Sequence, residues 1–121
     1  MTTNIIETPN GRVAVVHSDV PIVTDAQTAL DLAVTLFYGH GCRNIALNKA
    51  AINEDFFILS TGVAGEIAQK LVNYRYRLAI VGDFSGYTSR PLHDYIYECN
   101  RGRHLYFVGD EQAAIEKLGG V

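Results

Sequence analysis

The chain has 121 residues, of which 48% are hydrophobic and 19% charged, and its formal net charge is −3. This length is typical of one domain around one hydrophobic core, and the composition is neither that of a disordered chain nor that of a fibrous one. A negative charge gives no reason to expect nucleic-acid binding, which depends on neutralising phosphates. We therefore expect a single α/β domain over residues 1–121 that binds no nucleic acid.

The N-terminal residues lack the pattern of a secretion signal, because no basic segment precedes an apolar one. No apolar run approaches the roughly 18 residues that a membrane span needs. We therefore expect a cytoplasmic protein with no membrane partner. In that compartment Cys42 and Cys99 are expected to be reduced thiols.

The first elements form a predicted β-hairpin. Residues 4–7 and 12–16 are apolar segments separated by Asn10 and Gly11, a pair that favours a tight turn between two strands.

A helix is predicted over residues 25–38, where apolar side chains recur with helical spacing. Thr24 is expected to be its N-cap, in a capping box that Gln27 completes. Gly39 and Gly41 are expected to supply its left-handed end.

The remaining segments alternate between apolar strands and amphipathic helices. They are a strand at 44–48, a helix from Ser60-Thr61-Gly62 to Tyr74, a strand at 78–82, a helix that Ser89 opens and Gly102 ends, a strand at 105–108, and a short helix from Asp110 to Gly119. Such alternation favours parallel strands with right-handed crossovers. We expect a mixed sheet of about five strands, with an antiparallel hairpin followed by largely parallel strands, and four helices.

In open α/β sheets, ligands usually bind outside the carboxyl ends of the strands. The binding candidates expected at that edge are Ser60, Thr61, Gly62, Glu66, Lys49, Asp83 and Ser85. Two hydroxyls and a glycine beside the free amides of a helix start suit an anion or a phosphoryl group. The simpler interpretation is that Ser60 or Thr61 caps the helix, and that Asp83 and Ser85 only form a turn.

Arginines precede the predicted strands and should gather at the opposite edge of the sheet. They are Arg43, Arg75, Arg77, Arg101 and Arg103. Arginines there can complement the negative ends of helices, which contributes a few tenths of a kcal/mol each, or they can form a docking surface.

The known signatures of catalysis and of cofactor binding do not occur in the sequence. The histidines are scattered without HExxH or CxxC spacing, no serine lies in a G-x-S-x-G elbow, and the glycines match no nucleotide fingerprint. We therefore predict no catalytic residue, no metal ligand and no cofactor. Phe56 and Phe57 are adjacent in an irregular stretch, so one of the two rings is expected to be exposed.

The order of elements, with a helix that starts at Ser60-Thr61-Gly62, resembles that of STAS domains, the family of the bacterial anti-sigma-factor antagonists. In that family the residue before the glycine is phosphorylated by a partner kinase, which implies Thr61 as the phosphoacceptor, preceded by Ser60. The aspartate that opens the family's motif is replaced by Leu59. The strings DFFILSTGVAGEIAQKLVNY and LAIVGDFSGYTS, with IYECNRG, also resemble a bacterial family known as domain of unknown function 4180, which implies no activity.

These observations favour a non-enzymatic, STAS-like regulatory module that docks a protein partner at the start of the second helix, with a phosphorylation switch at Thr61 or Ser60. The alternative is a small-ligand or enzymatic site at the same edge, formed by Lys49, Asp83, Ser85 and backbone amides. A homodimer with a tyrosine-rich face is a third hypothesis.

Overall fold

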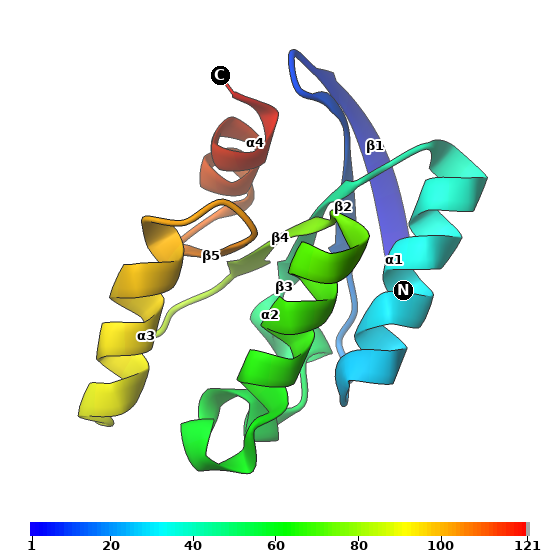
Figure 1. The fold of residues 1–121 in the computed structure, drawn as a ribbon. Helices are drawn as coiled ribbons and strands as arrows, with labels where there is room; N and C mark the ends of the chain where they lie inside the picture. The colour runs from blue at the N-terminus through cyan, green and yellow to red at the C-terminus, as the bar shows by residue number, and fades with distance from the viewer. Residues whose placement is uncertain (121) are drawn as a thin grey trace.

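The computed structural model describes residues 1–120 and shows one sheet with the strand order β1-β2-β3-β4-β5 (Figure 1). The strands are β1 (Thr2–Thr8), β2 (Gly11–His17), β3 (Asn44–Asn48), β4 (Arg77–Val81) and β5 (Leu105–Val108). β1 pairs with β2 in the antiparallel sense, and the other neighbours are parallel. The predicted mixed sheet is confirmed.

The four predicted helices are also confirmed. They are α1 (Ala26–His40), α2 (Val63–Tyr74), α3 (Arg90–Asn100) and α4 (Glu111–Gly119). Since the strands lie in chain order, three right-handed crossovers in the same direction place α1, α2 and α3 on one face of the sheet. α4 packs on the other face.

Each strand contributes to both layers of the core, because alternate side chains point to opposite faces. In β2, Ala14 and Val16 lie in the larger hydrophobic cluster, with α1, α2 and α3. Val13 and Val15 lie in the smaller cluster, with α4. The continuous burial of residues 13–16 therefore reflects a strand covered on both faces.

The expected cap of α1 was placed one residue too early. Asp25, not Thr24, is the N-cap, and its carboxylate accepts a hydrogen bond of 2.8 Å from the Thr28 amide. The Thr28 hydroxyl completes the box by accepting from the Asp25 amide, whereas the Gln27 amide donates to Asp31. The hydrogen bonds that the Asp25 carboxylate accepts, above all from the Thr28 amide, lower the pKa of Asp25, because they favour the ionised form.

The prediction that one ring of Phe56 and Phe57 is exposed was wrong. The two residues are 0% and 2% exposed and their rings meet edge to face at 5.0 Å. They lie in a short 3₁₀ helix, Glu54–Phe57, within a connection that also contains Lys49–Ala51 and Leu59–Thr61. Both rings are buried because each has its own aromatic neighbour, Phe107 of β5 for Phe56 and Tyr87 of the loop before α3 for Phe57.

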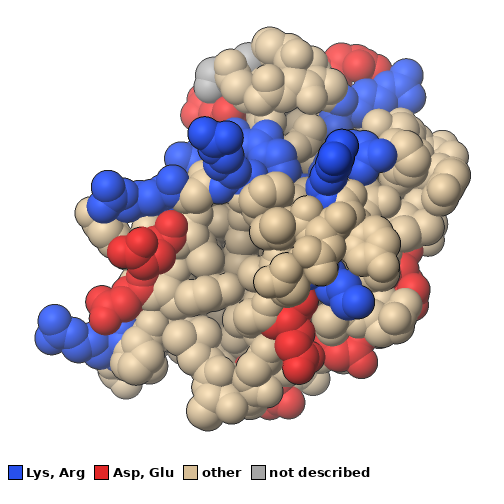
Figure 2. Space-filling view, in the orientation of Figure 1, with Lys and Arg blue, Asp and Glu red and all other residues tan. Residues whose placement is uncertain are grey.

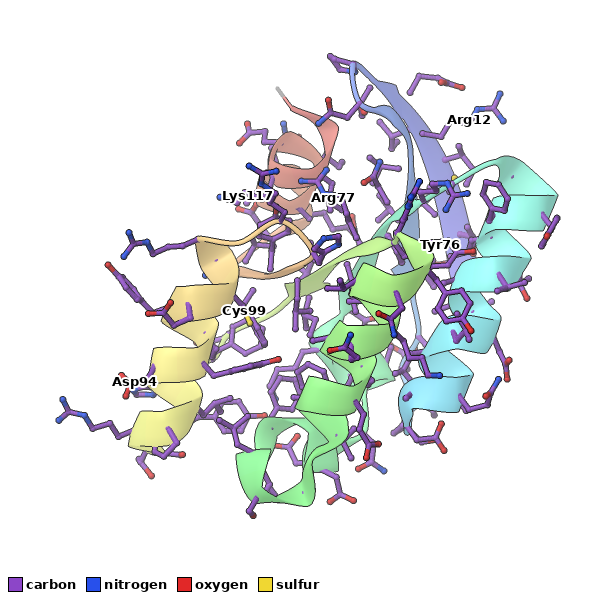
Figure 3. The ribbon with its side chains drawn as sticks, in the orientation of Figure 1. Arg12, Tyr76, Arg77, Asp94, Cys99 and Lys117 are labelled. Atoms are coloured by element: carbon purple, nitrogen blue, oxygen red, sulfur yellow. The ribbon has the colours of Figure 1, made fainter. Side chains whose placement is uncertain are left out.

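The arginines do gather at the edge where the parallel strands begin, and lysine and arginine atoms form a band across the upper part of Figure 2. Two of them complement helix ends. Arg43 donates to the carbonyl of Tyr74 at the end of α2, and Arg77 donates to that of Leu118 near the end of α4 (Figure 3). Within residues 1–120, no helix combines the length and apolar character that a membrane span requires.

Candidate functional site

The connection from β3 to α2 turns at Thr61, whose hydroxyl is already engaged within the fold. It donates to the carbonyls of Asp55 and Ile58, at 2.7 and 2.8 Å, and accepts from the Val63 amide at 3.3 Å. Thr61 therefore joins the turn that contains Ile58 to the first amide of α2.

The neighbours of Thr61 complete the start of α2. Gly62 is the N-cap and has a φ of 80°, a left-handed conformation that favours glycine. Ser60 is exposed, and its hydroxyl makes no hydrogen bond within residues 1–120. Glu66 lies in the first turn, where the helix dipole favours a carboxylate.

The ammonium group of Lys49 lies close to a carboxylate and two aromatic rings. Its Nζ lies 3.9 Å from Glu54 Oε2, 4.9 Å from the centre of the Tyr87 ring and 5.3 Å from that of Phe57. The Tyr87 hydroxyl donates to Glu54 at 2.6 Å, and burial together with this carboxylate raises the pKa of Tyr87. A Cβ at Gly82 would lie 2.7 Å from Lys49 Cβ, so a larger residue there would force Lys49 to shift.

Asp83 and Ser85 form the turn that follows β4. Asp83 accepts a hydrogen bond of 2.9 Å from the Ser85 amide. Its pKa is lowered by the Ser85 hydroxyl and amide and, to a smaller extent, by the charge of Lys49. The predicted residues therefore fall into two groups. Lys49, Asp83 and Ser85 form one, and Ser60, Thr61, Gly62 and Glu66 form the other at the start of α2.

A groove of about 420 Å³ separates the starts of α2 and α3, and we call it the helix-start groove. One wall is formed by the β3–α2 connection, where the Ile58 side chain is 51% exposed, and the other by the loop before α3. Its lining residues are Phe57, Ile58, Leu59, Ser60, Gly86, Tyr87, Thr88, Ser89 and Pro91. The second wall was missed from the sequence, where Ser85 and Ser89 indicated only a turn and a helix start.

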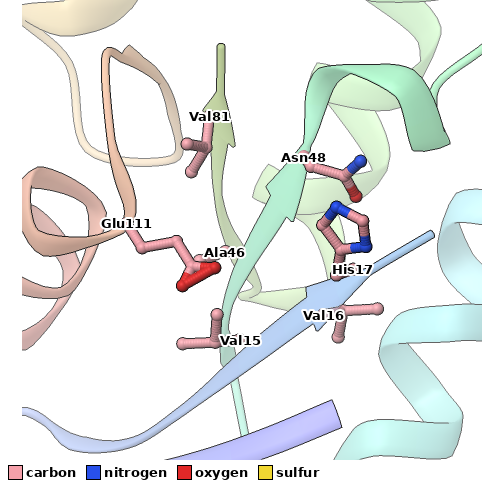
Figure 4. A pocket seen from close by; sticks show the side chains of 7 residues that line it. All are labelled: Val15, Val16, His17, Ala46, Asn48, Val81 and Glu111. Carbon is pink, nitrogen blue, oxygen red and sulfur yellow. The ribbon is translucent and has the colours of Figure 1, made fainter. Parts of the chain in front are cut away.

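A second hollow lies on the opposite face of the sheet, and we call it the sheet pocket (Figure 4). β2, β3 and β4 all lead to helices on the other face, so their carboxyl ends are covered here only by the start of α4. The pocket has a volume of about 230 Å³, and its lining residues are Val15, Val16, His17, Ala46, Asn48, Val81 and Glu111.

The polar side chains of the sheet pocket differ in what they can offer a ligand. The Asn48 side chain already makes two hydrogen bonds to the Ser18 backbone. Its Oδ1 accepts from the Ser18 amide at 2.9 Å, and its Nδ2 donates to the Ser18 carbonyl at 2.7 Å. His17 is half-exposed, with Nδ1 3.9 Å from Asp19. Glu111 lines the pocket from the start of α4 (Figure 4) and had no signal in the sequence beyond its position in a helix start.

The cysteines and metal-ligand residues add no further site. Cys42 and Cys99 are free thiols, and burial raises the pKa of both. Among residues 1–120 there is no group of three or more His, Cys, Asp or Glu side chains placed to hold a metal ion.

The fold and its grooves thus define an α/β protein with a five-stranded mixed sheet. A family model described as domain of unknown function (DUF4180) matches residues 8–118, and the chain belongs to that family. No curated protein and no solved structure gives a match. The resemblance to STAS domains stays a prediction.

Proposed function

We propose that this chain is a non-enzymatic interaction module that docks a protein partner in the helix-start groove, with Thr61 as a phosphorylation switch. The observation that carries the proposal is the bonding of Thr61. Its hydroxyl hydrogen is shared between two carbonyls of the turn that presents Ile58 to the groove. The state of one hydroxyl therefore controls one wall of the surface.

Phosphorylation of Thr61 by a kinase would replace that hydrogen by a phosphoryl group. The donor to Asp55 and Ile58 would be lost, and the added negative charge would face their carbonyl oxygens. The start of α2 favours the charge, whereas the carboxylates of Glu54 and Asp55 oppose it. The exposed Ser60 is the second candidate acceptor, and its modification would add charge to the groove without breaking these bonds.

A photocrosslinking amino acid at Ile58, used in extracts of the native host, tests the docking surface. We expect a crosslink to one defined protein that is absent when the same probe replaces Tyr38, which is 82% exposed on α1. Thr61→Val removes both hydrogen bonds, and a loss of about 1.4 kcal/mol of turn stability would weaken binding about tenfold. Thr61→Glu is expected to weaken it at least as much.

Thr61→Ser is the matched control, because it keeps the hydroxyl and both acceptors. We expect it to retain the crosslink. Equal crosslinking from positions 58 and 38, or a partner that binds the valine variant at unchanged affinity, would contradict the proposal.

The sheet pocket supports a second candidate function, the binding of a small molecule. Its floor of Val15, Ala46 and Val81 is apolar, and Glu111 supplies one carboxylate. This combination suits a compact amine with a short hydrocarbon body.

Benzylamine is a suitable probe of the sheet pocket, followed by amide chemical shifts. We expect the largest shifts at Ala46, Val81 and Glu111. Glu111→Gln should bind benzylamine more weakly, and Ala46→Leu should not bind it, because leucine fills the floor of the pocket. Glu116→Gln removes the same charge from α4 outside the pocket and should bind like the parent. Equal shifts in both glutamine variants would rule out recognition of the amine by Glu111.

A further inference from the structure

A groove at the other ends of α2 and α3 combines an apolar floor with one arginine, Arg103, and Arg75 follows the end of α2 beside it; we call it the basic groove. Its volume is about 170 Å³, and its lining residues are Ala68, Val72, Cys99, Gly102, Arg103, His104 and Leu105. Val72 and the nearby Tyr74 are each 48% exposed. This groove is separate from the helix-start groove, because it lies at the C-terminal ends of both helices.

The fold brings the segments that carry these arginines together. Arg77 Nε donates to the carbonyl of Arg103 at 2.9 Å, and His104 Nδ1 lies 3.2 Å from the carbonyl of Tyr76. The segment that begins with Arg75 therefore runs beside the turn that contains Arg103. The positive band in Figure 2 crosses this edge of the molecule.

Two of the arginine side chains at this edge, Arg75 and Arg103, form no hydrogen bond or ion pair within residues 1–120, whereas Arg43 and Arg77 are bound to helix ends. The ion pairs within residues 1–120 are Arg12–Glu7, His17–Asp19 and Lys49–Glu54. The side chains of Arg75 and Arg103 are exposed, and neither makes a hydrogen bond within the same residues. Arg101 reaches only the Tyr97 hydroxyl, at 3.3 Å. The charge of Glu98 acts on Cys99, so one carboxylate also lies near this groove.

Arg75 also has an unfavourable backbone conformation. It ends α2 with φ 62° and ψ 42°, and it is the only non-glycine residue with a positive φ among those that the structure describes. Glycine is the usual residue at such a helix end, because a Cβ is strained there. An arginine with a strained backbone, whose side chain forms no hydrogen bond or ion pair within residues 1–120, favours a role for that side chain in an external contact.

We propose that the basic groove binds an acidic, amphipathic segment of a partner protein. Aliphatic side chains of that segment contact Val72 and Leu105, and its carboxylates pair with Arg75 and Arg103. The aliphatic floor favours such a peptide over a nucleic acid, which would gain little from Val72 and Leu105.

The probe is a fluorescein-labelled helical peptide of glutamate and leucine, compared by anisotropy with a peptide in which lysine replaces every glutamate. We expect the acidic peptide alone to bind, with an affinity that falls as salt is added. Arg75→Gly should weaken binding about fivefold while raising the melting temperature by roughly 2–4 °C, because it relieves the strained conformation. A merely structural role for Arg75 would not produce opposite effects on binding and stability.

Arg90→Ser is the matched control, because it removes one exposed charge from the start of α3, away from the groove. It should bind the peptide like the parent, and Val72→Ser should weaken binding without altering the charge. Unchanged affinity in Arg75→Gly, equal binding of both peptides, or an RNA oligonucleotide bound through Arg75 in place of the acidic peptide would overturn the proposal. Binding in the helix-start groove is unaffected by each of these outcomes.

Discussion

Replacement of Arg77 by methionine is expected to reduce the free energy of unfolding by about 3 kcal/mol. The guanidinium joins the end of α4 to the sheet, with bonds of 2.9 Å to the Leu118 carbonyl and 2.9 Å to that of Arg103. It also reaches the Tyr106 hydroxyl at 3.0 Å and Asn44 at 3.3 Å. Methionine has a similar length but leaves these acceptors without their donor.

Chemical denaturation monitored by circular dichroism measures this loss, and Arg12→Met provides the comparison. Arg12 pairs at 2.8 Å with Glu7, but both side chains are more than half exposed, so its replacement should cost less than about 1 kcal/mol. Arg77→Lys keeps the charge without the planar fork and should recover only part of the stability. Equal effects of the two methionine substitutions would show that the network around Arg77 contributes little.

Phe57→Ala is expected to cost about 3–4 kcal/mol, as for a fully buried aromatic residue. The ring stacks on Tyr87 with a centroid distance of 5.2 Å and lies 5.9 Å from the ring of Phe84. Its removal would leave a cavity beside the helix-start groove and would take away the ring over which Lys49 lies.

Tyr38→Ala is the control for this second substitution, because Tyr38 is 82% exposed on α1. It should change the stability by less than about 0.5 kcal/mol. Calorimetry of both variants decides whether Phe57 belongs to the core, since a cost near zero for Phe57→Ala would indicate an exposed ring.

Helices and strands were predicted well where the residues that define them lie in one short segment of the chain. Asn44–Asn48 and Leu105–Val108 are strands with the predicted bounds, because each is an apolar run between polar residues. Ser89 and Asp110 cap α3 and α4 as expected, with their side chains accepting from the amides three residues on. The cap of α1 was ambiguous because Thr24 and Asp25 both suit that position.

The candidate site was predicted only in part. The sequence placed Thr61 at the start of α2, but not the carbonyls of Asp55 and Ile58 that its hydroxyl contacts. Those bonds depend on the path of an irregular connection, which no periodic pattern describes. For the same reason the sequence did not show that both Phe56 and Phe57 are buried.

The amino-acid sequence alone thus defined the fold class, the order of the elements and the family, because periodicity, caps and turn residues act over a few neighbouring positions. Only the tertiary structure paired the turn at Ile58 with the loop at Tyr87, Glu111 with Ala46, and Arg77 with the turn at Arg103. These pairs lie far apart in the chain. They meet because consecutive crossovers bring α2 and α3 to one face while α4 crosses to the other.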